Sequence, residues 1–362
     1  MNTNLLEKFD AWLQEESKAV ALVSRQYLVP VEGRDAVIFP PTYAPPEGFR
    51  GEWPGYNIDT FPDGSSVCLI DSVGSQANRL EPMFKHPPYH DLVPQVVVKI
   101  RTKGGQDIEV NILDAGHRAG DAVVRYSQLA AELSEAFKKL AQGDALPLAR
   151  LAPTSLIFGV WDSRGTQVKV SRLVRSVIRA YNVRPLHRSA TYVPPVMYEE
   201  KGVLETISDK IERDRRAEEG LVHNPASWSP GGVQVLGEIR RDAMCNLVQL
   251  RNFSSTTEEP MVFRRYLLGL ALVAFTAFPE TNLREGCELE LDPEHPAQNH
   301  NVYRDGQREP LTLTHEEALE FAREAAKAFG LPHEPRTVAF EPERLMEALK
   351  KSKEERKKGQ GI

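Results

Sequence analysis

The sequence predicts an α+β fold with a ferredoxin-like (RRM-type) core. Strand and helix patterns follow one another in the order strand, helix, hairpin, helix, strand, basic helix, insertion and strand, which resembles a βαββαβ core with decorations. Of the 362 residues, 41% are apolar and 27% are charged. This is enough apolar material for one large or two ordinary globular domains, and it excludes wholesale disorder.

The first predicted elements are two strands and a helix. Residues 19–31 are rich in Val and Leu and predict a strand. At about 40–56, repeated prolines forbid a regular ladder, while the aromatic residues between them could dock this loop on the body. A buried strand at 66–71 then runs into a helix at 72–81, which Pro82 ends.

The middle of the chain predicts a hairpin, a helix and a strand. A Gly-Gly pair joins strands at 96–101 and 108–112, because glycine tolerates the positive φ of tight turns. Helical periodicity predicts a helix at 123–140, and an apolar run at 155–161 predicts a buried strand.

The remainder predicts an insertion, a strand and three helices. From 187 to 232 the pattern is irregular, and an inserted segment of this length belongs on the rim of a domain. Strand character resumes at 233–250, and a buried helix follows at 261–275. Two helices are expected at about 310–358, the first beginning with the capping box Thr314-His315-Glu316-Glu317.

Charge is distributed unevenly along the chain. The formal net charge of −6 argues against a protein that coats nucleic acid indiscriminately. Residues 163–198 nevertheless carry +7, so that the remainder carries −13. The seven basic residues of this window, which has no acidic one, are Arg164, Lys169, Arg172, Arg175, Arg179, Arg184 and Arg188. The asymmetry predicts a focused anion site on an acidic body.

Part of this basic window predicts an amphipathic helix at 168–181, because its apolar residues recur at about 100° per residue. Four cations lie opposite the apolar face: Lys169, Arg172, Arg175 and Arg179. Their line, about 15 Å long, matches the reach of two or three backbone phosphates. A solvated face is the usual explanation, but like charges at helical neighbours repel and no acid within the helix offsets them. We therefore expect an anionic partner.

The strand-to-helix junction at 71–81 is a second candidate site. The first N–H groups of a helix are unpaired and attract phosphate, and Ser72, Gly74 and Ser75 leave room for one. The side chains of Gln76, Asn78 and Arg79 could add donors. Alternatively, Ser72 or Ser75 caps the helix and Arg79 pairs with an acid.

Metal and catalytic patterns are poor. Two prolines between His86 and His90 prevent a helix from aligning them, and no third ligand is near in sequence. No G-x-S-x-G, Walker A, GxGxxG or HExxH pattern occurs. The three cysteines are far apart, so neither a disulfide framework nor a metal pair is expected. We expect no catalytic residue, no metal and no cofactor.

The sequence also favours a soluble, cytoplasmic protein. No stretch approaches the roughly 18 apolar residues of a membrane-spanning helix. The first residues read as an amphipathic helix with acidic positions and lack the pattern of a secretory signal. Sparse cysteines fit a reducing compartment, and no membrane partner is expected.

Three segments carry a resemblance to a known family. They are CLIDSVGSQANRLE at 68–81, SLIFGVWDS at 155–163 with the basic stretch after it, and GEIRR at 237–241 running into Asn246-Leu247. Together they look like the backbone subunit of a type I-G (formerly I-U) CRISPR effector complex, the Cas-seven-type branch of the RAMP superfamily. The resemblance covers roughly 19–275, and SQANR is its specific part.

This resemblance implies a single RAMP-type domain over 1–362 with an RRM-like palm. Its core would span about 19–275, with a thumb-like insertion at about 187–232 and a fingers- or web-like loop at about 40–56. The C-terminal helical region at about 310–358 adds little. The implied RNA contacts are Ser75, Gln76, Asn78, Arg79, Lys169, Arg172, Arg175, Arg179 and Arg240.

The function implied is that of a non-catalytic CRISPR RNA-binding scaffold in antiviral defence. Copies would polymerise head to tail along the guide, as a helical ribonucleoprotein filament, and present the guide for pairing with target DNA. Further implied partners are other Cascade subunits (a Cas-five/Cas-six-type fusion and a large subunit) and a recruited helicase-nuclease. The acidic stretch at 280–294 is a candidate assembly surface, or else a solvated loop.

Two other functions remain open. A RAMP-type metal-dependent RNase would cleave guide-paired RNA through a loop Asp, for which Asp71, Asp114 and Asp162 are the candidates. A single-stranded nucleic-acid chaperone outside CRISPR would show no preference for a repeat-derived 5′ handle.

Overall fold

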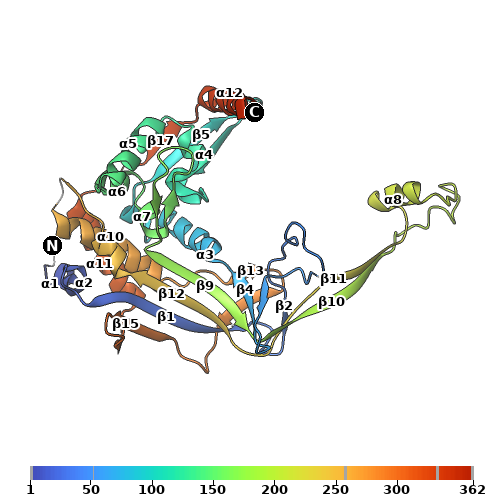
Figure 1. The fold of residues 1–362 in the computed structure, drawn as a ribbon, viewed down its shortest axis with the longest axis horizontal. Helices are drawn as coiled ribbons and strands as arrows, with labels where there is room; N and C mark the ends of the chain where they lie inside the picture. The colour runs from blue at the N-terminus through green and yellow to red at the C-terminus, as the bar shows by residue number, and fades with distance from the viewer. Residues whose placement is uncertain (1–2, 52, 257–258, 332–333, 360–362) are drawn as a thin grey trace.

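The computed structural model describes residues 3–51, 53–256, 259–331 and 334–359. A large curved sheet carries helices at one end, and a long two-stranded arm projects away from the rest of the molecule (Figure 1). Within these ranges, no helix combines the length and apolar character needed to cross a membrane.

The elements have the following bounds. The helices are α1 Thr3–Glu7, α2 Asp10–Leu13, α3 Val73–Leu80, α4 Ala122–Arg125, α5 Ala130–Ala141, α6 Leu146–Leu151, α7 Thr154–Phe158, α8 Lys210–Glu218, α9 Leu247–Arg251, α10 Pro260–Thr276, α11 His315–Phe329 and α12 Pro342–Gly359. The strands are β1 Ala19–Pro30, β2 Val37–Ile38, β3 Ile58–Thr60, β4 Ser66–Asp71, β5 Val96–Arg101, β6 Asp107–Asn111, β7 Val160–Trp161, β8 Lys169–Val170, β9 Val174–Tyr181, β10 Val183–Tyr192, β11 Asn224–Val235, β12 Ile239–Asn246, β13 Asn282–Arg284, β14 Cys287–Leu291, β15 Gln298–Tyr303, β16 Arg308–Pro310 and β17 Arg336–Ala339.

The main sheet has the order β13-β14-β1-β12-β9-β4-β3, with β15 also on β1 and β16 on β15. Its central strands β1, β12, β9 and β4 pair antiparallel. Helix α3 packs against β9 on one face of this sheet, where Ser176 of β9 donates a hydrogen bond to Gln76 of α3. The predicted α+β class is therefore confirmed.

Helices α10 and α11 form the centre of the apolar core. From Tyr266 to Phe275, every residue of α10 is buried. A Cβ added at Gly269 would lie 2.8 Å from the Cα of Ala322 in α11, so the glycine allows the two helices to approach closely. The predicted capping box of Thr314 and Glu317 is present at the start of α11. The helices predicted at 261–275 and 314–329 are thus confirmed.

The segment 168–181 is not the helix that its periodicity predicts. It forms β8, a short connection and β9. The β-branched residues of this segment favour a strand. Along β9, Arg175 and Arg179 lie on one face of the sheet, while Ser176 and Ile178 are buried on the other. The predicted line of four cations on one helix face is therefore wrong.

Three other predicted elements also differ. The segment 155–161 is mostly helix α7, which ends at Gly159 with φ of +80°, because a short apolar run fits a buried helix as well as a strand. The predicted helix at 123–140 is interrupted between α4 and α5, where Ser127 bridges to Phe340. The stretch 233–250 contains the end of β11, β12 and α9, which Asn246 caps.

The predicted hairpin forms as β5 and β6 but lies outside the main sheet. These strands build a separate sheet with β17, which pairs parallel to β5 from the far end of the chain. The order of elements from which we predicted a ferredoxin-like core is therefore not reproduced. That core remains a prediction.

The insertion at 187–232 forms most of the projecting arm. Strands β10 and β11 pair along it, and α8 lies near its far end (Figure 1). At the root of the arm β11 also pairs with β2. The Tyr56 hydroxyl accepts a hydrogen bond of 2.9 Å from the backbone N–H of Gly232, which joins the end of the 40–56 loop to the arm. Tyr56 is thus buried, whereas Tyr43 and Phe49 of the same loop are exposed, so the docking expected of this loop is seen only at its end.

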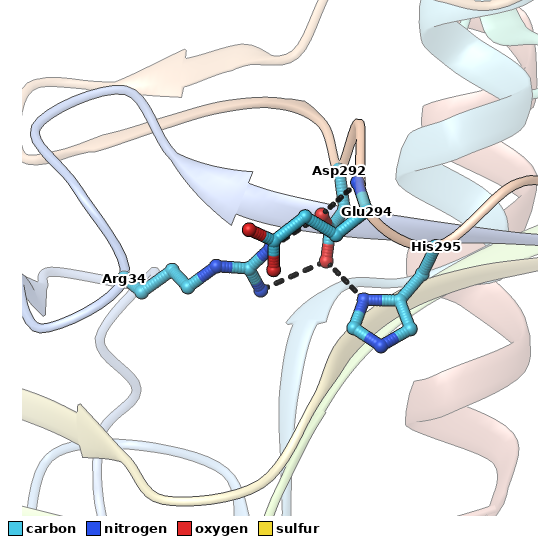
Figure 2. Close-up of polar contacts among 4 residues, drawn as sticks. All are labelled: Arg34, Asp292, Glu294 and His295. Carbon is cyan, nitrogen blue, oxygen red and sulfur yellow. Dashed lines mark hydrogen bonds and ion pairs between the residues drawn. The ribbon is translucent and has the colours of Figure 1, made fainter.

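A charged cluster fastens the connection after β1 to the connection after β14 (Figure 2). Arg34 donates two hydrogen bonds to the Asp292 carboxylate, at 2.9 and 2.6 Å, and one to Glu294 at 2.7 Å. The His295 Nδ1 atom lies 2.7 Å from the same Asp292 carboxylate. These bonds lower the pKa of Asp292 well below its usual range. Part of the predicted acidic stretch 280–294 is thus paired within the chain.

We expect Asp292→Asn to destabilise the protein at neutral pH and to have a smaller effect in acid. A carboxylate whose pKa is lowered by folding adds stability above its unfolded pKa of about 3.9, and this contribution is lost as the pH falls further. Thermal melting from pH 7 to pH 3 should therefore show a gap between wild type and variant that is constant above about pH 5 and narrows as the pH falls below about 4. A gap that persists unchanged at pH 3 would contradict this account.

Candidate nucleic-acid interface

A basic groove of about 1100 Å³ lies between α3, the β7–β8 hairpin and the start of β9. It is lined by the basic side chains of Arg118, Arg125, Arg164, Lys169, Arg172 and Arg175. Among the described residues that line it, none is Asp or Glu. Clustered positive charge in a concave surface focuses the field and concentrates anions. The groove therefore has the electrostatics of a polyanion site.

Several of the groove cations are available to a ligand. Arg164 and Arg172 are exposed and form no ion pair with a described residue. Arg175 is also exposed, and its Nη2 atom donates to the Met244 sulfur at 3.7 Å, with no ion pair to any residue that the structure describes. Lys169 places its Nζ atom 5.6 Å from the ring centre of Trp161. These side chains are not neutralised by the protein itself, so an anion from outside can pair with them.

Two other groove cations have structural partners. The buried Arg118 guanidinium lies 2.7 Å from the Glu81 carboxylate, and burial raises the pKa of Glu81 to about 7. Arg118 also donates to the Asn78 side-chain oxygen at 3.2 Å. Arg125 donates to the backbone carbonyl of Gly120 at 2.9 Å. These two arginines form part of the groove wall, and their guanidinium groups are already bonded within the protein.

At the 71–81 junction, the structure shows the alternative in which Ser72 caps the helix and Arg79 pairs with an acid. The Ser72 side chain accepts the backbone N–H of Ser75 at 3.2 Å, and Arg79 donates to the buried Asp71 carboxylate at 3.2 Å. Asn78 is exposed but holds Arg118. The Ser75 side chain is half-buried.

Gln76 does not have the place expected of an RNA contact. It is fully buried and donates to Asp71 at 2.6 Å, while its oxygen accepts from Ser176 at 2.9 Å and from Arg241 at 3.1 Å. A side chain with 0% exposure cannot touch a ligand on the surface. Its role in this structure is to connect α3 to the sheet.

The face of the sheet that carries Arg175 and Arg179 continues the groove. A second hollow of about 470 Å³ shares Arg175 and Met244 with the groove and is also lined by Arg25, Arg179 and Arg308. Its acidic lining residue among those described, Asp242, accepts hydrogen bonds of 3.0 Å from Arg25 and from Arg240. The positive charge therefore extends along the sheet.

Arg240 is occupied within the protein. Besides Asp242 it contacts Glu238, and it donates to the Tyr181 hydroxyl at 2.9 Å. Its guanidinium centre also lies 4.0 Å from the centre of the Tyr181 ring. The predicted contacts thus fall into two groups. Lys169, Arg172, Arg175 and Arg179 share one continuous surface, whereas Gln76, Arg79 and Arg240 hold neighbouring elements in place.

The three acids considered for metal-dependent cleavage do not meet. Asp71 is buried between Gln76 and Arg79. Asp162 accepts the backbone N–H of Thr166 at 2.6 Å and so closes the turn between β7 and β8. Asp114 pairs with Lys85 at 2.6 Å. Within the described ranges, no group of three His, Cys, Asp or Glu residues is placed to hold a metal ion.

Several groove residues were missed by sequence reasoning. Arg25, Arg118 and Arg308 come from distant parts of the chain, and only the tertiary fold brings them to this surface. The apolar run around Trp161 places it inside a buried strand, whereas its side chain is exposed. Arg164 was named in the basic window but not among the RNA contacts, and the excess of positive charge in that window is the available signal.

Comparison with known proteins gives one match to a family. A family model described as CRISPR-associated protein GSU0053 (Cas_GSU0053) matches residues 22–185, less than half of the chain. A search of curated proteins found no match. A solved structure titled "CRISPR RNA-guided surveillance complex, pre-nicking" has 12% sequence identity, with 91% of this chain and 98% of that chain covered. Its TM-score of 0.34 is too low to support an argument.

The matched segment contains most of the candidate interface. It includes α3, the β7–β8 hairpin and β9, and so all the basic residues of the groove. The remaining groove residues, Met244 and Asn246, follow it on β12. Over residues 22–185, the chain is similar to a family of CRISPR-associated proteins.

Proposed function

We propose that this protein is a non-catalytic, RNA-binding scaffold of a CRISPR effector complex of the Cascade kind. The observation that carries the proposal is the charge of the groove. Its exposed arginines form no ion pair with a described residue, and no described lining residue is acidic. The match to a CRISPR-associated family supports the same class of protein. Subtype I-G and the role of backbone subunit belong to this proposal.

The chemistry of the groove suits a guide of any sequence. Arginine and lysine bind phosphates and position a strand without reading its bases. A strand held in this way keeps its base edges free to pair with target DNA. The net charge of −6 limits binding to the places where cations gather, such as the groove. CRISPR RNA as ligand and target DNA as its pairing partner are part of this proposal.

Assembly is the second part of the proposal. Head-to-tail assembly requires two different complementary surfaces on each copy. The projecting arm offers one of them, as a thumb, and carries the exposed apolar side chains Tyr192, Val193, Val203 and Ile211. A chain of copies on one guide would also contact other Cascade subunits and recruit a separate helicase-nuclease to cut the DNA.

Co-expression with a CRISPR RNA tests the proposal. We expect the purified protein to carry the guide and to form assemblies whose length in electron micrographs follows guide length. Binding should fall steeply with salt, because phosphate contacts release counterions. Particles of constant length, or a protein that purifies without RNA, would contradict the scaffold role.

The same preparation tests the RNase alternative. With Mg²⁺ or Mn²⁺ and a complementary RNA, we expect the guide-paired strand to remain intact, because Asp71, Asp114 and Asp162 are each engaged elsewhere. Metal-dependent cleavage that disappears in Asp114→Ala, the most exposed of the three acids, would establish the nuclease instead.

A further inference from the structure

Trp161 stands out in the basic groove. Its side chain is 54% exposed and lies among cations, whereas the valines that line the same groove are buried or half-buried. It lies on β7 directly opposite Lys169 of β8, whose ammonium group is 5.6 Å from the ring centre. An aromatic ring and a cation thus project from one hairpin, with the ammonium group over the ring.

The hairpin that carries Trp161 is firmly built. Asp162 donates its backbone N–H to the carbonyl of Val168 at 2.9 Å, and its carboxylate accepts both the N–H and the hydroxyl of Thr166. Behind it, a Cβ at Gly120 would come within 2.8 Å of the Trp161 carbonyl oxygen, so the backbone is closely packed there. The backbone that carries the exposed ring is therefore held in position.

We propose that Trp161 is a stacking platform for one unpaired nucleobase of the RNA strand whose phosphates lie on Arg164, Arg172 and Arg175. This inference rests on the proposed function of the groove. Every base has a π-face, so stacking adds affinity without sequence preference. A neighbouring ammonium group strengthens the arrangement, because it pairs with phosphate while the ring accepts the base. The groove then recognises single strands by both their bases and their backbone.

The chain offers a matched control. Trp228 is equally exposed, at 56%, but lies on β11 in the arm, stacked on His187 with ring centres 4.2 Å apart. It lines neither of the two basic hollows. Replacing Trp228 removes an exposed indole of the same size without touching the groove.

The experiment compares two ligands of equal length: a single-stranded RNA, and a strand with abasic residues that keeps the phosphates. We expect Trp161→Ala to weaken binding of the RNA about tenfold and to leave binding of the abasic strand unchanged, as stacking on one base implies. Trp161→Phe should keep most of the affinity, and Trp161→Leu, which fills space without a π-face, should lose it. Trp228→Ala should match wild type when both strands are short enough to bind a single copy, so that the arm makes no assembly contact.

The outcomes separate this inference from the function on which it rests. If wild type binds neither strand, the proposed function fails, and the stacking role fails with it. If wild type binds both strands and Trp161→Ala behaves like wild type, only the stacking role is wrong. Equal losses on both strands, or full affinity in a folded Trp161→Leu protein, would also overturn it. Melting curves of all variants show whether each is folded.

Discussion

Reversing two charges in the basic groove, Arg172→Glu together with Arg175→Glu, is expected to weaken binding of guide RNA by roughly 100-fold or more. Each substitution removes a cation that neutralises a phosphate and puts a repelling charge in its place. The slope of log K against log salt should also fall by about 2, one for each phosphate that is no longer neutralised. Binding titrations at several salt concentrations measure both effects.

The fold should tolerate this change. Both side chains are exposed, and neither forms an ion pair with a described residue. The free energy of unfolding should therefore move by no more than about 0.5 kcal/mol. A variant that is unfolded by circular dichroism would show that the groove arginines are structural.

A matched control separates the groove from net charge. Lys138→Glu with Lys139→Glu makes the same change of charge in the last turn of α5, on exposed side chains outside the groove. We expect this protein to bind RNA within about twofold of wild type, since charges that do not line the groove make no direct phosphate contact there and act only through screened solvent. Equal losses in the two double variants would indicate nonspecific attraction, and unchanged binding in the groove variant would place the RNA elsewhere.

The error at 168–181 shows which part of the site the sequence could predict. Apolar residues at 174, 177, 178 and 181 satisfy a helical period. They also fit a strand in which most residues are buried. The spacing of the apolar residues therefore did not distinguish a helix from a strand. The excess of positive charge in this segment did not depend on that choice. Arg172, in the connection before β9, and Arg175 and Arg179, on β9, still line one continuous surface, as they would have in the helix.

Signals that depend on a few neighbouring residues were predicted correctly. The capping box at Thr314 and the Gly-Gly hairpin between β5 and β6 are both of this kind. The placement of the hairpin was not predictable, because its partner β17 lies more than 200 residues later. The same limit applies to Arg118 and Arg308, which reach the basic surface only through the tertiary fold.

Gln76 shows how a long-range network can look like a surface site. In the sequence it is a polar donor next to Asn78 and Arg79 at a helix start. In the structure its oxygen accepts from Arg241, 165 residues away, whose guanidinium also donates to Gln26 at 2.7 Å. Arg241 is 1% exposed and forms no ion pair with a described residue. Burial lowers its pKa to about 10, so it is still charged at neutral pH.

We therefore expect Gln76→Leu to destabilise the protein by about 3 kcal/mol, because a buried guanidinium would lose one of its two acceptors and Asp71 would lose a donor. Denaturant unfolding of wild type and variant measures the loss. Ser75→Ala, on the same helix and outside the network, is the control and should change stability by no more than about 0.5 kcal/mol.

Binding then decides what Gln76 does. Where the Gln76→Leu protein is folded, at low temperature and without denaturant, its affinity for RNA should stay within about twofold of wild type, because the side chain is screened from any ligand. The opposite pattern, with unchanged stability and weakened binding, would mean that α3 opens to expose Gln76 when RNA binds. Because the two patterns differ in both measurements, one variant distinguishes a residue that holds the interface together from one that touches the guide.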